Sequence, residues 1–126
     1  MKVLITGGMG VIGAEASRRF VKEGHRPVLF ARHRDDNLIG DLAEKVDIEL
    51  GDITDLPRLL DVIKRNGITH IVHAAAFVGA VSQANPALSI QVNVNGTVNV
   101  LEAARLFDIK RVVFTSAKGI YGPLTG

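Results

Sequence analysis

The 126-residue sequence contains no cysteine, which excludes disulfide bonds, thiolate metal ligands and a cysteine nucleophile together. Aromatic residues make up only 5% of the chain, so aliphatic side chains must supply the core that a 47% hydrophobic composition allows. No apolar run approaches the roughly 20 residues needed to span a bilayer, and the N-terminus lacks the pattern of a signal peptide. These absences predict a soluble, cytoplasmic protein with no membrane partner.

An excess of charge of one sign is also missing, because 15 basic and 13 acidic residues leave a net charge of only +2. This excess is too small and too scattered for a nucleic-acid-binding surface, so no nucleic-acid partner is expected. No spacing of histidine and acidic residues is typical of a metal site, so no metal is expected either. The length is that of one domain.

Short apolar runs alternate along the chain with longer amphipathic stretches. The short runs predict strands within residues 2–6, 27–31, 46–50, 69–76 and 110–116. The amphipathic stretches predict helices over residues 11–23, 36–45, 55–67 and 85–108. This alternation is typical of an α/β fold, a Rossmann-type doubly wound parallel sheet with strand order 3-2-1-4-5. Residues 46–50 alternate apolar and acidic side chains, so their strand is expected at an edge of the sheet.

Apolar spacing also predicts which face each helix buries. The predicted stripes are Ile12, Ala16 and Phe20 in the first helix, Leu56, Leu59, Leu60 and Ile63 in helix 55–67, and Val94, Val98 and Leu101 in helix 85–108. Asp55 or Thr54 is the expected N-cap of helix 55–67, and Gly24 and Gly67 are expected just beyond the ends of their helices.

The stretch "TGGMGVIGAE" (6–15) has four glycines where the first predicted strand leads into the first predicted helix. In this context Gly7 permits a tight turn, Gly10 lets the backbone approach a diphosphate, and Gly13 lets the helix pack closely on the sheet. The helix N-terminus would present free N–H groups to the phosphates. The spacing does not match a P-loop. The alternative is a glycine-rich turn that binds no ligand.

The end of the second predicted strand reads "FARHRDD". Dinucleotide sites often have an acidic residue at this position to bind the ribose hydroxyls, but here Ala31 occupies it. With Arg32 and Arg34 available for charge-assisted hydrogen bonds to a 2′-phosphate, the pattern favours NADP over NAD. The alternative is a solvated basic loop whose arginines are neutralised by residues 35–36.

Small and polar residues follow the third and fourth predicted strands. Asp52 could accept a hydrogen bond from an adenine amino group, although a role in the turn is the alternative. The alanines at 74–76 would let a cofactor lie close to the backbone, or would serve close helix packing. His73 is interpreted as a structural residue at a strand end rather than as a ligand or base.

Together these stretches resemble the extended short-chain dehydrogenase/reductase family, in its NAD-dependent epimerase/dehydratase group. The matching motifs are "TGGMGVIG" (6–13), "GDITD" (51–55), "HAAA" (73–76), "NVNGTVNVLEAAR" (93–105) and "FTSAKGIYG" (114–122). The resemblance implies that the diphosphate contacts Gly7, Gly10, Val11, Ile12 and Gly13. It further implies that Asp52 and Ile53 contact adenine, that Ala74, Ala75 and Ala76 flank the ribose and nicotinamide, and that Asn93 braces the site.

Two departures from the family pattern concern catalysis. The family's catalytic Ser/Thr stands four residues before the tyrosine of "YG", and here that position is Ala117. Ser116, one position earlier, is kept among the cofactor-binding candidates. The family's Tyr-x-x-x-Lys pair, a general acid/base, lies beyond "YG", and Tyr121 is followed four residues later by Thr125 rather than lysine. No residue of this chain is therefore predicted to be catalytic, and Tyr121 is interpreted as a loop or packing residue.

The expected function is that of the cofactor-binding portion of a longer NAD(P)-dependent enzyme, with residues 1–126 as its N-terminal Rossmann domain. By the resemblance, the whole enzyme would act on a nucleotide sugar or a related carbonyl or alcohol. Without later strands, residues 110–116 would form an exposed apolar edge, and a homodimer is one expected consequence. The alternatives are a non-catalytic NAD(P)-binding sensor or scaffold, and a doubly wound domain for another nucleotide.

Overall fold

A parallel five-stranded sheet, in the order β3-β2-β1-β4-β5, forms the centre of the computed structural model, which describes residues 1–123. Its strands are β1 (Val3–Thr6), β2 (Val28–Ala31), β3 (Asp47–Leu50), β4 (His70–His73) and β5 (Arg111–Phe114). All four residues of β1 are buried, as expected for the central strand of a sheet covered on both faces. The predicted fold class and strand order are confirmed.

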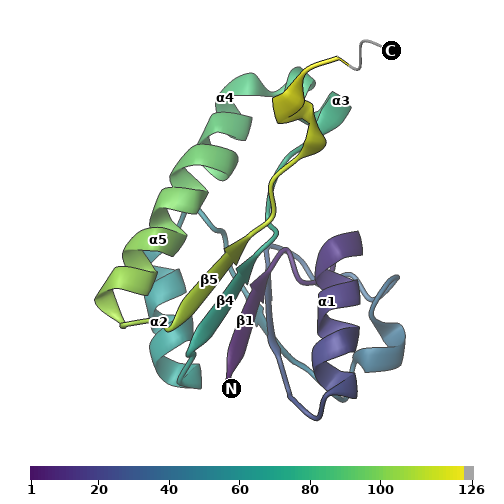
Figure 1. The fold of residues 1–126 in the computed structure, drawn as a ribbon, viewed down its shortest axis with the longest axis vertical. Helices are drawn as coiled ribbons and strands as arrows, with labels where there is room; N and C mark the ends of the chain where they lie inside the picture. Colours follow the sequence, from purple (N-terminus) through teal and green to yellow (C-terminus); the bar gives the residue numbers. More distant parts are fainter. Residues whose placement is uncertain (124–126) are drawn as a thin grey trace.

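Helices cover both faces of the sheet (Figure 1). On one face α1 (Val11–Lys22) packs over β1 and β2, and on the other lie α2 (Leu56–Asn66) and α5 (Gly96–Leu106). Alternate strand residues divide between the two faces, so that Leu4 belongs to the core under α2 and α5 and Ile5 to the core under α1. Both cores are almost entirely aliphatic, as the composition requires.

Helix α1 has the predicted bounds to within one residue, but its predicted stripe is only partly confirmed, because Ala16 and Phe20 are half-buried and pack against the core whereas Ile12 is exposed. Its fully buried residues are Gly13, Ala14 and Ser17, whereas Ile12 is 57% exposed. Small residues face the sheet because they let the helix axis approach it closely. The buried Ser17 hydroxyl is satisfied by donating to the Gly13 carbonyl at 2.7 Å.

Residues 36–45 do not form the predicted helix. Only a single 3-10 turn, η1 (Gly40–Leu42), lies in this segment. Ile39 and Leu42, two apolar residues of this segment, are instead buried in the core beneath α1. Tertiary burial of two side chains, rather than helical periodicity, therefore explains the pattern.

The predicted helix 85–108 consists of α4 (Pro86–Ile90), a π-helical turn η2 (Gln91–Asn95) and α5 in continuous succession. A further short helix, α3 (Gly79–Ala84), was not predicted. The stripe predicted for this helix is wrong, because Val94, Val98 and Leu101 are 53–56% exposed. The buried face of this long helix is made instead by Val92, Gly96, Val100 and Ala103.

Helix α2 follows its sequence signals closely. Asp55 is the N-cap, and its side chain accepts a hydrogen bond from the Arg58 N–H at 3.1 Å. Gly67 ends the helix in the left-handed conformation with φ of 61°. Gly24, just beyond α1, likewise has a positive φ of 88°.

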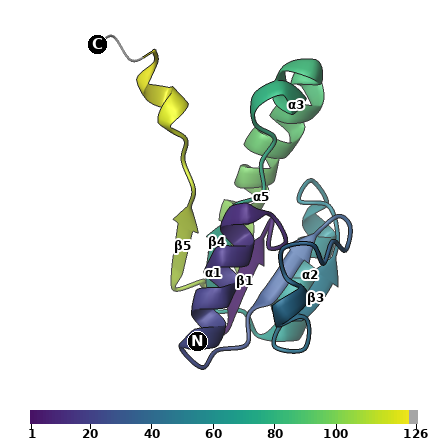
Figure 2. The same ribbon diagram turned by 90° about the vertical axis from the view of Figure 1, so that its right-hand side faces the viewer.

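The two edge strands differ in how they are covered. On β3, Glu49 forms ion pairs with Arg58 and Arg65 of α2, so the edge is shielded by charge. On β5, Val113 and Phe114 are 49% and 59% exposed. Figure 2 shows β5 standing at one side of the molecule, with the following segment and its 3-10 turn η3 (Lys118–Tyr121) extending beyond the sheet.

Candidate functional site

The glycine turn joins β1 to α1 at the carboxyl end of the sheet. Gly7 has a φ of +65°, and a Cβ at this position would lie 2.9 Å from the Ala75 backbone nitrogen. A Cβ at Gly13 would lie 2.2 Å from the Gly7 carbonyl oxygen. Both positions therefore require glycine, one for the turn conformation and the other for the close approach of helix and turn.

The first N–H groups of α1 have no hydrogen-bond acceptor within the helix. The first intrahelical hydrogen bond runs from the Ala14 N–H to the Gly10 carbonyl at 2.8 Å, so the N–H groups of residues 11–13 precede it. Gly10, the N-cap, has no side chain to cap them, and the first turn contains no acidic residue. This end of the helix therefore carries partial positive charge suited to an anion.

Two pockets adjoin this turn and share part of their lining. One, of about 240 Å³, lies at the ends of β2 and β3 and is called the β2-side pocket. The other, of about 570 Å³, reaches the end of β5 and is called the β5-side pocket. The shared lining residues are Gly7, Gly10, Ala74, Ala75, Ala76 and Phe77. The pockets thus form two adjoining halves across β1 and β4, where the strand order reverses.

All twelve predicted cofactor-binding residues line one or both pockets. Arg32, Asp52 and Ile53 line the β2-side pocket. The β5-side pocket is lined by Val11, Ile12, Gly13 and Ser116, and the two glycines and three alanines that remain are shared by both. The structure therefore brings the candidates together, and their individual roles stay predictions.

Asp52 has a role in the turn and also faces the pocket. Its Oδ1 accepts hydrogen bonds from the Thr54 N–H at 3.0 Å and from the Thr54 hydroxyl at 2.8 Å. The Thr54 N–H is the main reason that the pKa of Asp52 lies below its ordinary value, and the charge of Arg32 also contributes. Asp52 is thus an ionised acceptor at the edge of the β2-side pocket.

The two arginines after β2 are not equivalent. Arg34 forms an ion pair with Asp36 at 2.9 Å, as the alternative of a neutralised basic loop predicts for this residue. Arg32 lines the β2-side pocket, and no ion pair in residues 1–123 includes it. Of the pair, only Arg32 is placed to meet a ligand.

The wall formed by residues 74–77 is held from the long helix. Asn93, in the π-helical turn, accepts from the Phe77 N–H and donates to the Phe77 carbonyl, both at 2.8 Å. This is the bracing role that the resemblance implies. Asn99 donates to the Ile53 carbonyl at 3.0 Å, so the same helix also holds the β2-side pocket. Sequence reasoning missed Asn99, because its partner lies 46 residues away.

Beneath the pockets lies a buried polar network that was also missed. His73 is 1% exposed, and its ring contacts Thr6 of β1 at 2.7 Å and Thr97 of α5 at 3.0 Å. Burial lowers the pKa of this histidine below its usual 6.5. The prediction of a structural role at the strand end agrees with this placement, but the link to Thr97 has no signal in the sequence.

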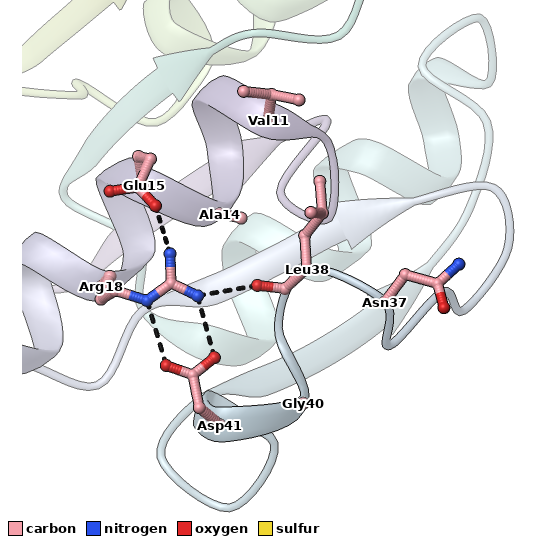
Figure 3. Close-up of a pocket in the computed structure, with 8 residues that line it drawn as sticks. All are labelled: Val11, Ala14, Glu15, Arg18, Asn37, Leu38, Gly40 and Asp41. Atoms are coloured by element: carbon pink, nitrogen blue, oxygen red, sulfur yellow. Dashed lines mark hydrogen bonds and ion pairs between the residues drawn. The ribbon is translucent and has the colours of Figure 1, made fainter.

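A separate pocket lies between α1 and the loop that follows β2 (Figure 3). Arg18 fills its polar side by donating to both carboxylate oxygens of Asp41, at 3.0 and 2.8 Å, and to the Leu38 carbonyl at 2.8 Å. Glu15 also accepts from Arg18. The charged groups here already bind one another, and these bonds hold the loop against α1. This pocket is therefore no candidate site for the phosphates of a ligand.

The segment after β5 contains Ala117 and Tyr121, the two positions at which the sequence departs from the family's catalytic pattern. Ala117 lines the β5-side pocket beside Ser116, so the position of the family's Ser/Thr faces the pocket but carries only a methyl group. Tyr121 is 83% exposed in η3, so it is not a packing residue. Thr125 lies outside the described residues. Within residues 1–123 no helix is both long and apolar enough to cross a membrane.

Comparison with known proteins finds similar sequences that match nearly the whole of this chain. The sequence model of the "NAD dependent epimerase/dehydratase family" matches residues 3–126. A UDP-glucose 4-epimerase of Rhizobium meliloti (strain 1021) is 35% identical over 95% of this chain, which spans 36% of that protein. A UDP-glucose 4-epimerase of Klebsiella pneumoniae is 32% identical over 97% of this chain, which spans 93% of that protein.

A solved structure supports the same relationship. The UDP-glucose 4-epimerase of Thermus thermophilus in complex with NAD superposes on 99% of this chain with a TM-score of 0.89 and 29% identity. The matched region is 40% of that chain. This chain thus spans less than half the length of the Rhizobium and Thermus proteins.

Proposed function

The chain belongs to the NAD dependent epimerase/dehydratase family, and from this premise we propose that residues 1–126 are the dinucleotide-binding domain of an enzyme acting on a nucleotide sugar. The observation that carries the proposal is the glycine turn, which borders two adjoining pockets and leads into residues 11–13, whose free amides begin α1 and which line the β5-side pocket. A dinucleotide has two nucleoside halves joined by a diphosphate, and the site has the same division.

The residues fit such a ligand in the following way. The amides of residues 11–13 bind the diphosphate, and Gly10 gives it room, because a Cβ there would meet only the Gly7 carbonyl oxygen, at 3.4 Å. Asp52 and Ile53 hold adenine in the β2-side pocket, and Ala74, Ala75 and Ala76 lie under the ribose and nicotinamide. The nicotinamide half then occupies the β5-side pocket. When bound, the nicotinamide supplies hydride-transfer chemistry.

We further propose a preference for NADP over NAD. The support is Arg32 in the β2-side pocket, together with Ala31 where a carboxylate would repel a 2′-phosphate. Arg34 is not part of this proposal, because Asp36 already neutralises it. The structural relative from Thermus carries NAD, so the preference would distinguish this chain from it.

The 126-residue chain alone is proposed to bind the dinucleotide without turnover. Its one tyrosine is not followed by lysine four residues later, and Ala117 cannot donate or accept a proton. The same observation favours the second candidate function, a non-catalytic dinucleotide sensor or scaffold. A Tyr-x-x-x-Lys pair in the rest of a longer gene product would support the enzyme, and its absence there would support the sensor.

A homodimer is proposed, and besides the β5 edge the chain has another exposed apolar surface for it, on the helix formed by α4, η2 and α5. Ile90, Val94, Val98 and Leu101 are 53–58% exposed and recur every three or four residues, so they form one apolar stripe. Burying such a stripe against its copy would remove it from water. Val98→Asp should convert a dimer in analytical ultracentrifugation into a monomer, whereas a wild-type monomer at all concentrations would contradict the proposal.

Calorimetric titration with NAD, NADP and ADP tests the proposed function. Wild type should bind all three, with NADP tightest, and Gly10→Val should abolish binding while the protein remains folded. Gly40→Ala is the matched control, because Gly40 has open space around it and lies away from both pockets. Failure of wild type to bind any of the three ligands would overturn the proposal.

A further inference from the structure

The polar network under the pockets is centred on His73, which contacts two neighbouring strands and the helix that covers them. His73 ends β4 with its ring buried, facing Thr6 from β1, Thr97 from α5 and Phe114 from β5. The Phe114 ring stacks on the imidazole with centroids 5.8 Å apart. No charged side chain is among these neighbours, so the imidazole is held by hydroxyl groups and an aromatic face alone.

The hydrogen bonds fix which ring nitrogen carries the proton. The Thr97 hydroxyl donates its one proton to the Asn93 carbonyl at 2.7 Å. It can therefore only accept from His73 Nε2, which must carry the ring proton. In the neutral ring Nδ1 is then an acceptor, and the Thr6 hydroxyl donates to it at 2.7 Å. His73 is thus a neutral Nε2–H imidazole.

This arrangement orients groups on both walls of the β5-side pocket. Because Thr6 donates to His73, its oxygen is free to accept from the N–H groups of Ala74 and Ala75, at 3.1 and 3.2 Å. On the other side, the bond to Thr97 anchors the turn of the helix that carries Asn93. An unbroken path therefore runs from the end of β1, through the imidazole, to the residue that holds Phe77.

We propose that His73 is a positioning residue for the nicotinamide half of the dinucleotide, and this inference rests on the proposed function. By tying β1 to α5 through its two nitrogens, it sets the distance between the 74–77 wall and the helix. His73 lines neither pocket, so it acts on the ligand through Thr6 and Thr97 rather than by direct contact. The β2-side pocket is held separately, through Asn99 and Ile53.

Two substitutions of His73 each remove one of its two hydrogen bonds and keep the other. The amide oxygen of asparagine stands as many bonds from the backbone as Nδ1, so His73→Asn keeps the acceptor for Thr6 and loses the bond to Thr97. By the same count, the amide nitrogen of glutamine replaces Nε2, so His73→Gln keeps the bond to Thr97. His70→Asn is the matched control, because His70 lies at the other end of β4 and lines neither pocket.

Calorimetry with NAD and ADP then tests the proposal, since ADP has no nicotinamide half. Each His73 variant should weaken NAD binding about fivefold, the loss expected for one buried hydrogen bond, and leave ADP binding unchanged. His70→Asn should leave both unchanged. Equal weakening of NAD and ADP, or wild-type affinity for NAD in both variants, would overturn the inference but not the proposed function. Failure of wild type to bind NAD would overturn both.

A measurement on wild type covers the case in which neither variant folds. Nitrogen-15 NMR of the imidazole should show a protonated Nε2 and an unprotonated Nδ1, and its Nε2 resonance should move on addition of NAD but not of ADP. A ring protonated at Nδ1, or an Nε2 resonance that ignores NAD, would contradict the positioning role.

Discussion

Replacing Gly13 with alanine tests the closest contact between helix and turn. The added Cβ would lie 2.2 Å from the Gly7 carbonyl oxygen, 2.6 Å from the Gly8 Cα and 2.8 Å from the Gly7 carbonyl carbon. All three atoms belong to the backbone, so no side chain can rotate to relieve the overlap. Either α1 moves outward, which loosens the packing of Ala14 and Ser17, or the turn must deform.

The magnitude follows from two opposing effects. Overpacking a tight site costs about 1–3 kcal/mol, and rigid backbone neighbours place this site at the upper end, about 3 kcal/mol. Alanine favours the helix over glycine by about 1 kcal/mol, which offsets part of the cost. We therefore expect Gly13→Ala to lower the free energy of unfolding by about 2 kcal/mol, or Tm by about 6–10 °C.

Urea denaturation followed by circular dichroism measures this difference, with Gly40→Ala as the control. A Cβ added at Gly40 would have no heavy atom within 4 Å, so Gly40→Ala should change the unfolding free energy by less than about 0.5 kcal/mol. If Gly13→Ala were as stable as the control, the turn and helix could not be as close as the structure has them.

Three further outcomes are expected. Asp55→Ala removes the N-cap of α2 and should cost about 1 kcal/mol in urea denaturation, whereas no loss would deny the cap a role. Because burial lowers the pKa of His73, the unfolded chain binds a proton that the folded chain excludes. The unfolding free energy should therefore fall as the pH drops below 6.5, and less steeply in His73→Asn; equal slopes would contradict this. Arg32→Glu should weaken NADP binding far more than NAD binding in calorimetry, and an unchanged ratio would refute the NADP preference.

The fold could be predicted well from the sequence because the signals that determine it are local. Strand runs, Asp55 at a helix start and Gly67 at a helix end are each encoded within a few neighbouring residues. The glycine turn is predictable for the same reason, since its position between a strand and a helix is visible in the order of residues. The pockets also follow, because parallel strands end at one edge of the sheet.

The errors arise where packing overrides periodicity. The spacing of Ile12 and of Val98 has the helical period, but the faces that contact the sheet carry Gly13 and Gly96, because close approach favours small side chains over large apolar ones. Apolar spacing therefore gives the period of a helix and not always its buried face. Pairs such as His73 and Thr97 are 24 residues apart and meet only in the folded chain, so no local pattern could reveal them.

The central claim is that the free amides at the start of α1 bind the diphosphate of a dinucleotide. Amide NMR spectra of the ¹⁵N-labelled chain, recorded during titration with NAD, test it residue by residue. The account predicts the largest shifts at Val11, Ile12 and Gly13, with smaller shifts along residues 74–76. Unmoved resonances at these three amides, with binding established by shifts elsewhere in the chain, would contradict it.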